Sequence, residues 1–388
     1  MKLEEAQAIF KQASEAYKND NINHAIELFS KIEKNFDGLN KIYARAQFHL
    51  ANLMDDLKRY EEAEKAYNNV QKEDNVGLYA NAQFNLGVSL KQQDRLKEAE
   101  EAYNNVQKEY SIELYARAQC NLGFLLRKQN WLEEAEQAYQ NVKREDTAEQ
   151  YARAQFNLGS LLKQQDRLTE VEQAYQNVKR EDSAEQYARA QFNLGLLLEE
   201  QNRLEEVEQA YKNILREDNA ELYAEAQVNL GFLYQRLGRI EEAKKTYNKV
   251  KLIDSAIQYS WAQWNLYILL DETAYLKKIK IEYDLETYAE AQFLLGEFTT
   301  ILNKKNAFWE KIPKKSTQYR KESYQINVVA SIVALDESKY KNRLYYIFEK
   351  ISGILKSIFI DTDYEKSIAH YTNLTGLCCT KIWNAKRP

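Results

Sequence analysis

The sequence predicts an all-α protein, a right-handed α-solenoid of stacked helix hairpins that ends in a C-terminal helical cap. A nine-residue segment, YARAQFNLG, begins at Tyr151 and recurs from Tyr187. Variants of it, 36 residues apart, begin at Tyr43, Tyr79, Tyr115, Tyr223 and Tyr259. Self-similarity at such a period is the signature of stacked repeats. The 388 residues include only 11 Gly and 2 Pro, which leaves few places for a helix to stop.

Each repeat has two amphipathic halves. In one repeat the first half runs from about 152 to 165, with Leu158 and Leu161 at helical spacing on one side. The second half runs from about 168 to 179. Two helices per repeat, joined by a short turn, are therefore expected.

Polar residues mark the turns of the repeat. The break between the two halves contains Asp94, Asn130, Asp166 or Asn202. Asn and Asp are preferred helix N-caps, so we expect these residues to cap the second helix. Thr147 with Gln150, and Ser183 with Gln186, match the Ser/Thr-x-x-Gln capping box and predict the start of the first helix.

A Leu-Gly pair in the first half is followed by a small residue and, four positions later, an aromatic one in the second half. The pair stands at Leu86-Gly87, Leu122-Gly123, Leu158-Gly159, Leu194-Gly195, Leu230-Gly231 and Leu295-Gly296. The small and aromatic residues include Ala63/Tyr67, Ala99/Tyr103, Ala135/Tyr139 and Ala243/Tyr247. This pattern resembles the tetratricopeptide repeat, a pair of antiparallel helices.

The sequence departs from that family in three ways. Gln stands where the family has an early Trp, at 47, 83, 119, 155, 191, 227, 263 and 292. The closing Pro of the family is absent, and the repeat is longer than the usual 34 residues. With these departures the repeat resembles a divergent branch of the family, near the Sel1-like repeats. The two-helix architecture stays the expectation.

Three segments are expected along the chain. Residues 1–302 form the repeat array, which is regular over 43–257 and degenerate over 258–302. From about residue 303 the period fades, and apolar helical stretches predict a C-terminal cap over 303–363. Residues 364–388 are expected to be the remnant or the start of a further domain.

That last segment contains YEKSIAHYTNLTGL, beginning at Tyr364. It resembles the opening of a bacterial domain family of unknown function that starts with His-Tyr-Thr and follows tetratricopeptide arrays. His370, Tyr371 and Thr372 are also similar to the first motif of ADP-ribosyltransferase-like folds, where the His helps to hold a nicotinamide dinucleotide. Sixteen residues follow Thr372, too few for the rest of such a fold, so we expect no catalysis by this chain.

The resemblance implies where a partner binds, because the first helices of tetratricopeptide repeats line the concave face of the stack. Four columns recur on them: Arg117, Arg153 and Arg189; Phe84, Phe156 and Phe192; Asn85, Asn121, Asn157, Asn193 and Asn229; and Lys91, Arg127 and Lys163. Amides pair with a peptide backbone, and guanidinium groups pair with carboxylates. The columns predict a groove for a protein or an acidic peptide. In the alternative, structural interpretation they join neighbouring helices, fill the core and pair with Glu of the next repeat.

The composition disfavours several other functions. The sequence contains 54 Lys and Arg residues and 59 Asp and Glu residues, which gives a net charge of −5. This charge argues against nucleic acid or an anionic membrane as the partner. No stretch is long and apolar enough to span a bilayer, and the amino end lacks the order of a secretory leader. The three Cys make no disulfide framework, so a cytoplasmic location is expected. No metal-ligand spacing or phosphate loop occurs, so neither metal nor cofactor is expected.

The sequence thus predicts a non-catalytic scaffold or sensor module that binds a protein or peptide on the concave face. Two alternatives stay open. One is the regulatory arm of a truncated ADP-ribosyltransferase-like effector. The other is a helical-repeat protein that binds single-stranded nucleic acid, which the acidic balance disfavours. Self-association through the uncapped ends of the stack is a further expectation.

Overall fold

The computed structural model describes residues 2–34 and 39–284, together with residues 287, 288 and 291. The chain divides into two compact units, an N-terminal unit (Met1–Leu237) and a C-terminal unit (Gly238–Pro388). Within the described residues every regular element is a helix, which confirms the all-α class. The predicted cap (303–363) and the His-Tyr-Thr segment (364–388) lie outside the described residues.

The N-terminal unit is a series of helix hairpins. The first helices are α1 (Leu3–Lys18), α3 (Asn40–Asp56), α5 (Val76–Gln92), α7 (Ile112–Lys128), α9 (Ala148–Gln164), α11 (Ala184–Glu200) and α13 (Ala220–Arg236). The second helices are α2 (Ile22–Ser30), α4 (Tyr60–Asn68), α6 (Leu96–Asn104), α8 (Leu132–Gln140), α10 (Leu168–Asn177) and α12 (Leu204–Lys212). From α3 onwards the first helices begin 36 residues apart, which confirms the period. They start four residues before the amphipathic pattern, which was predicted from about residue 152, but directly after Thr147 and Ser183, as the capping boxes predicted.

The C-terminal unit contains α14 (Ile240–Tyr247), α15 (Ala256–Leu270) and α16 (Thr273–Leu276). Leu276 and Ile279 form a small core with Tyr288, against which Trp264 packs. The second helix of the repeat that begins with α15 is thus a single turn. The array boundaries at 43, 257 and 302 and the handedness of the stack stay predictions.

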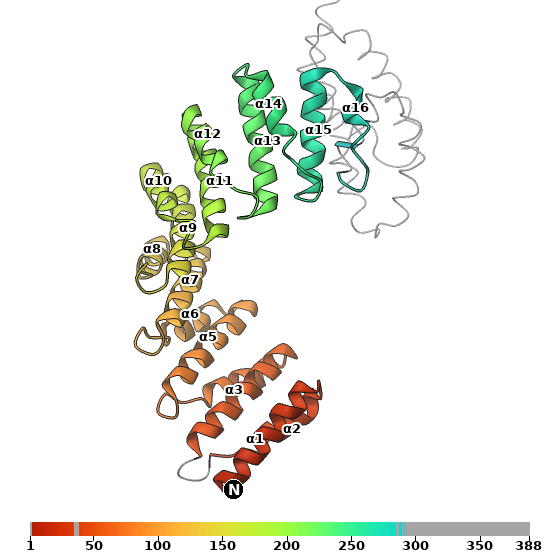
Figure 1. Ribbon diagram of the computed structural model, residues 1–388. Helices are drawn as coiled ribbons and strands as arrows, with labels where there is room; N and C mark the ends of the chain where they lie inside the picture. Colours follow the sequence, from red (N-terminus) through yellow and green to blue (C-terminus); the bar gives the residue numbers. More distant parts are fainter. Residues whose placement is uncertain (1, 35–38, 285–286, 289–290, 292–388) are drawn as a thin grey trace, which may run out of the picture. The chain divides into compact units, whose positions relative to one another are not determined.

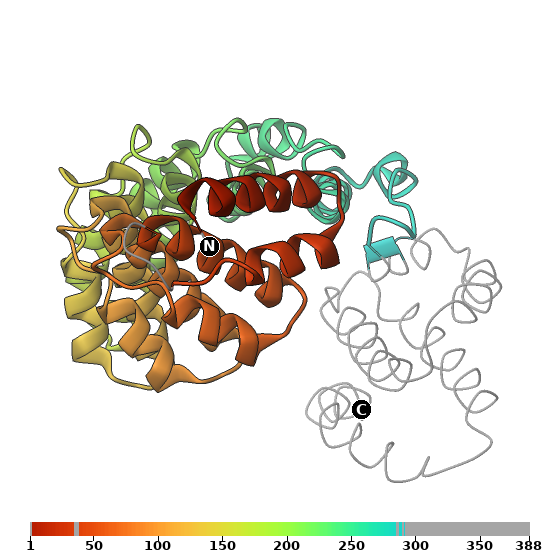
Figure 2. The same ribbon diagram turned by 90° about the horizontal axis from the view of Figure 1, so that it is seen from below.

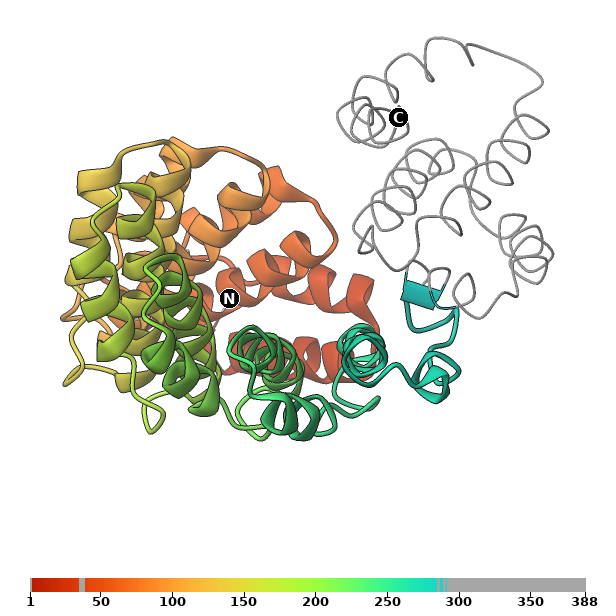
Figure 3. The same cartoon turned by 90° about the horizontal axis from the view of Figure 1, so that it is seen from above.

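The hairpins of the N-terminal unit pack in chain order. Each second helix packs on the first helix of its own repeat and on that of the next, while successive first helices also touch. In Figure 1, α8, α10 and α12 form the left edge of this unit, with α7, α9 and α11 to their right. Figure 2 and Figure 3 show from opposite sides that each hairpin is turned relative to the one before it. One side of the first helices is therefore left uncovered by second helices.

The polar residues in the turns do not cap the second helices as predicted. Asp94, Asn130, Asp166 and Asn202 instead have φ of 58–63°, the left-handed conformation that ends the first helix. The next amide then returns to the helix, as Arg95 N donates to Leu90 O at 3.0 Å. Asn and Asp tolerate this conformation better than other side chains with a Cβ. The N-cap of the second helix is the following residue, an Arg or Trp131, without a side-chain cap bond.

The caps of the first helices were predicted more accurately. The Ser183 hydroxyl accepts a hydrogen bond from the Gln186 amide at 3.4 Å, whereas Thr147 makes no side-chain cap bond. Asn75 and Asn219 cap α5 and α13 in the same way as Ser183 caps α11. These caps satisfy amides that a helix start leaves without a partner.

The Gln that replaces the family's Trp is a buried hydrogen-bond partner. In five repeats its Oε1 accepts from the Asn that ends the second helix of the same hairpin, at 2.9–3.1 Å. The pairs are Gln47/Asn69, Gln83/Asn105, Gln119/Asn141, Gln155/Asn177 and Gln191/Asn213. Because both ends of each bond lie within one hairpin, the bond fixes the angle between its two helices.

The two helices of a hairpin meet where a tyrosine lies against a glycine. The contacts join Gly87/Tyr103, Gly123/Tyr139, Gly159/Tyr175 and Gly195/Tyr211, and these tyrosines are fully buried. A Cβ added at Gly159 would lie 2.5 Å from the Tyr175 ring. The glycine of the Leu-Gly pair is therefore required by this close approach.

Neighbouring repeats are joined by ion pairs between their loops. Each pair links a Lys or Arg to an Asp in the loop of the next repeat, as in Lys34/Asp74, Lys108/Asp146, Arg144/Asp182 and Arg180/Asp218. The Asp side chains are largely buried. In the third repeat Tyr110 stands at this position, and Lys72 lies over its ring at 4.8 Å.

Gly159→Ala is expected to lower the free energy of unfolding by about 1–3 kcal/mol, because the added methyl group forces the Tyr175 ring out of its site. Gly77→Ala is the control, since the nearest atom to its added Cβ lies 3.7 Å away. That change should leave stability equal or raise it by up to about 1 kcal/mol through helix propensity. Urea unfolding followed by circular dichroism measures both, and an equal effect of the two changes would contradict the packing explanation.

Candidate functional site

The candidate site is the first-helix face, the side of α3, α5, α7, α9, α11 and α13 that second helices leave uncovered. On α7 this face carries Glu113, Arg117, Phe124 and Lys128, spaced so that they share one side of the helix. All four are exposed or half-buried. The sequence-predicted columns are placed on or beneath this face, and their contacts differ.

The Phe column lies mostly beneath the face. Phe84 and Phe192 are buried and Phe156 is half-buried. Each ring contacts the buried tyrosine of its own hairpin, with centroids 5.8–6.0 Å apart. These side chains therefore contribute chiefly to packing within the hairpin.

The Asn column joins each repeat to the one before it. Asn121 Nδ2 donates to the Tyr103 hydroxyl at 3.5 Å, and Asn193 Nδ2 donates to the Tyr175 hydroxyl at 3.3 Å. Asn85 Nδ2 donates to Asn52 at 3.0 Å. Asn157 and Asn229 are half-buried at the equivalent positions. At least three of these amides are thus used by the stack itself.

Four of the six predicted basic residues are engaged by carboxylates or rings, Arg127 among them through the Phe124 ring. Arg189 pairs with Glu185 at 2.7 Å, and Lys163 pairs with Glu200 at 2.9 Å. The Arg117 guanidinium lies 4.6 Å from the centre of the Phe84 ring. A cation over an aromatic face keeps its charge, so Arg117 still contributes positive potential.

Three cations from three repeats converge on the face without a carboxylate partner. We call Lys91 of α5, Lys128 of α7 and Arg153 of α9 the basic cluster. Burial lowers the pKa of Lys91, and the charges of Arg153 and Lys128 lower it further. Arg153 Nη2 donates to Asn121 Oδ1 at 3.1 Å, which holds the guanidinium in place. Within the described residues none of the three forms an ion pair, so their mutual repulsion is not neutralised.

A buried hydroxyl beside the basic cluster also lacks a partner. Tyr139 is fully buried, and its Oη makes no hydrogen bond. Burial raises the pKa of Tyr139, while the charges of Arg127 and Arg153 act in the opposite direction. A buried donor without a partner costs free energy.

Carboxylates act on the buried tyrosines on either side of this region. Burial raises the pKa of Tyr67 beneath α3, and Asp55 and Asp56 raise it further. Burial likewise raises the pKa of Tyr211, and there Glu199 and Glu225 raise it further. For Tyr103, whose pKa burial raises to about 12, the nearby charge is Arg153, which lowers it. The charges that act on Tyr67 and Tyr211 are thus negative and the charge that acts on Tyr103 is positive, while Arg45 of α3 lies over the Phe10 ring.

Two exposed aromatic residues on the face were missed at the sequence level. Phe124 is 38% exposed and Phe232 is 50% exposed, and Arg127 and Arg236 lie over their rings at 5.8 and 6.0 Å. Their column reads Asn52, Val88, Phe124, Ser160, Leu196 and Phe232. Variation among otherwise near-identical repeats is the signal that could have identified it.

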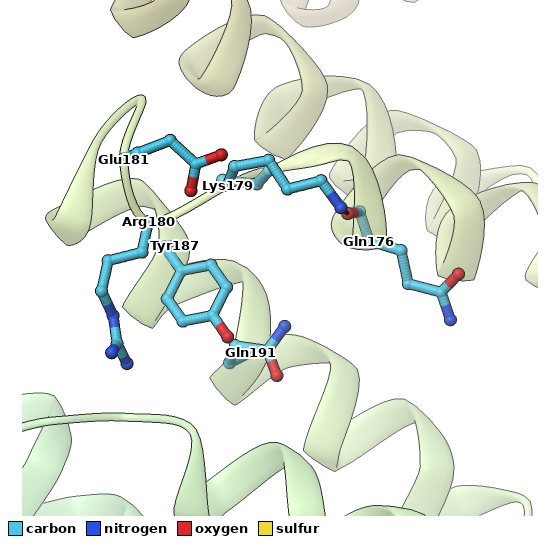
Figure 4. Close-up of a pocket in the computed structure, with 7 residues that line it drawn as sticks. Gln176, Lys179, Arg180, Glu181, Tyr187 and Gln191 are labelled. Carbon is cyan, nitrogen blue, oxygen red and sulfur yellow. Dashed lines mark hydrogen bonds between the residues drawn. The ribbon is translucent and has the colours of Figure 1, made fainter.

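A pocket of about 470 Å³ lies where α10 leads into α11 (Figure 4). Arg180 lies over the Tyr187 ring at 4.9 Å and pairs with Asp218 at 3.1 Å, while Gln191 accepts from Asn213 at 2.9 Å. These polar groups already join neighbouring repeats, so we assign the pocket a structural role.

The part of the chain that the structure describes holds no group of three His, Cys, Asp or Glu residues able to bind a metal. Nor does any helix in it have the length and apolarity to cross a membrane.

His49 lies against an aromatic ring of the first repeat. It stacks on Phe29 with ring centroids 5.5 Å apart, and burial and then the charge of Arg45 lower its pKa.

Glu225→Gln is expected to change the pH dependence of stability. Burial and then Glu221 raise the pKa of Glu225 above 4.5, so folding favours its protonated form. The contribution of this group to the free energy of unfolding is complete below pH 4.5, and it is lost as the pH rises through the raised pKa. Glu225→Gln should therefore gain stability relative to the parent between pH 4 and pH 7.

Urea midpoints at pH 4 and pH 7 measure this change, with Glu149→Gln at an exposed position of α9 as the control. A midpoint difference between Glu225→Gln and the parent that is the same at both pH values would contradict the prediction.

Two tetratricopeptide-repeat family models match the chain. One covers residues 224–257, and the other matches three times, over residues 10–77, 55–111 and 84–148. No curated protein matches the chain.

Several solved structures are similar to this chain at low identity. The C-terminal part of a tetratricopeptide-repeat protein from Cytophaga hutchinsonii is 13% identical over 62% of this chain and 93% of its own, with a TM-score of 0.46. The apo form of RapI is 13% identical over 79% of this chain and 99% of its own, with a TM-score of 0.46. YrrB, described as a protein with an unusual peptide-binding site, is 20% identical over 44% and 83%, with a TM-score of 0.33. The helix hairpins described above agree with these matches, in which residues 10–148 and 224–257 are recognised as tetratricopeptide repeats.

Proposed function

We propose that this chain is a non-catalytic protein-binding scaffold that holds an acidic segment of a protein partner on its first-helix face. The observation that carries the proposal is the basic cluster, Lys91, Lys128 and Arg153, which converges from three repeats without a carboxylate to neutralise it.

The electrostatics of the cluster favour an anionic ligand. A half-buried ammonium group beside two like charges destabilises the free protein. A carboxylate placed among them relieves that repulsion, and each charged hydrogen bond contributes about 1.5–3 kcal/mol.

The surroundings of the cluster suit a peptide chain. Phe124, exposed on α7 between Arg117 and Lys128, offers apolar contact for a side chain next to the acidic group. Stacked repeats hold such residues on a rigid, extended surface, so little conformational entropy is lost by the protein on binding.

The test is a fluorescence-anisotropy titration of the full chain with twelve-residue peptides of graded Asp and Glu content. Acidic peptides are expected to bind, and the triple change Lys91→Gln, Lys128→Gln and Arg153→Gln should weaken binding at least about tenfold. A parallel measurement of molecular mass keeps self-association apart from peptide binding.

The matched control removes three positive charges outside the first helices, by Lys65→Gln, Lys97→Gln and Lys143→Gln. If both triple variants lose affinity equally, only the net charge matters and the site is not the first-helix face. If no acidic peptide binds, the proposal is wrong.

A further inference from the structure

The position directly before each second helix carries an arginine in all but one of the regular repeats. An Arg precedes α4, α6, α10 and α12, whereas Trp131 precedes α8. The Trp131 side chain is 41% exposed. One repeat of the N-terminal unit therefore presents a large aromatic ring where its neighbours present a guanidinium group.

In three repeats this arginine bridges two carboxylates. Its Nε donates to the Glu three residues later in its own second helix, at 2.6–2.7 Å. Its Nη1 donates to a Glu of the preceding second helix, at 2.5–2.6 Å. The bridges are Glu64/Arg95/Glu98, Glu136/Arg167/Glu170 and Glu172/Arg203/Glu206. Stacking of the repeats thus brings two carboxylates within reach of one guanidinium group.

The repeat of Trp131 keeps both carboxylates and lacks the cation. Glu100 of α6 and Glu134 of α8 stand at the bridge positions, 36 residues from Glu64 and Glu98. Glu100 is half-buried and Glu134 is exposed, and neither forms an ion pair within the described residues. Burial raises the pKa of Glu100, and the charges of Glu101 and Glu134 raise it further, while Lys97 lowers it. The two carboxylates are therefore left without the guanidinium group that joins their equivalents.

A buried amide beside Trp131 also lacks a partner. In two of the bridges the arginine donates as well to the Gln two residues before it, at Gln165 and Gln201, at 2.9 and 3.0 Å. Gln129 is the equivalent residue, and its buried Nε2 makes no hydrogen bond. Because rotation of the amide exchanges its two ends, Gln129 is able to present Oε1 as an acceptor. All the groups that surround a guanidinium group in the neighbouring repeats are thus present here without one.

We propose that Trp131, Glu100 and Glu134 form a second binding site, on the second helices, which takes the guanidinium group of an arginine in a protein partner. The two carboxylates accept hydrogen bonds from its N–H groups, as they do in the neighbouring repeats. The Trp131 ring offers a face for cation–π contact, for which tryptophan is the best aromatic residue. A planar guanidinium group joins two carboxylates through separate N–H groups, so arginine is preferred to lysine.

The experiment uses the full chain labelled with 5-fluorotryptophan and followed by ¹⁹F NMR. The signal of Trp131 is the one lost in Trp131→Phe. The probes are twelve-residue Gly-Ser peptides with one central Arg, Lys or citrulline. The Arg peptide should shift the Trp131 signal to saturation, and the Lys peptide should bind at least about threefold more weakly. The citrulline peptide, which is neutral, should leave the signal in place.

The decisive variant is Glu100→Gln with Glu134→Gln. It should weaken binding of the Arg peptide about tenfold or more, because both charged hydrogen bonds are lost. Glu61→Gln with Glu205→Gln is the matched control, since it removes two exposed carboxylates from the first turns of α4 and α12. The control should bind the Arg peptide as the parent does.

The convergence of the two carboxylates is tested without a ligand. Trp131→Arg supplies the missing guanidinium group, so it should form the bridge of the neighbouring repeats and unfold at a higher urea concentration than Trp131→Gln. Circular dichroism follows both variants.

Four outcomes would overturn the proposal. They are a Trp131 signal that the Arg peptide leaves in place, an equal loss of affinity in the decisive and control variants, equal affinity for the Arg and Lys peptides, and equal urea midpoints for Trp131→Arg and Trp131→Gln. Binding of acidic peptides to the first helices is independent of all four, so the two proposals fail separately.

Discussion

The buried contact of a tyrosine with a glycine is what the rest of the N-terminal unit depends on. It brings the two helices of a hairpin together, as at Gly159 and Tyr175, where no Cβ would fit. The tyrosine hydroxyl then reaches the first helix of the next repeat, where Asn193 binds it. One side chain thus fixes both the hairpin and its stacking on the following hairpin.

Duplication preserves these contacts in each repeat. The positions that distinguish the surface of one repeat from that of another are therefore those where near-identical repeats differ. α9 and α11 differ in their last turns, at Ser160 and Leu196, Lys163 and Glu199, and Gln164 and Glu200. These residues are outside the tyrosine contact, so they change without cost to the fold. The charge of the first-helix face is therefore set repeat by repeat, while the interior stays the same.

The basic cluster and Glu225 reduce the stability of the folded chain. Lys91 and Glu225 are half-buried, and each lies beside charges of its own sign. Both arrangements disfavour the folded state, because burial and neighbouring like charge each penalise the charged form. The ion pairs of the loops, such as Arg144 with Asp182, supply the cohesion between repeats elsewhere.

The sequence by itself determined the helix pairs, their 36-residue period and the identity of each column, because these follow from local periodicity and repetition. The sequence pattern assigned Asp94 and its equivalents to the wrong helix end. An Asn or Asp between two helices can either end the first helix or cap the second, and the pattern does not distinguish these roles. Only the tertiary structure decided which cations are free: Lys163 meets Glu200 and Lys91 approaches Arg153 across repeats. Such distant pairs depend on the rotation between hairpins, which no local pattern encodes.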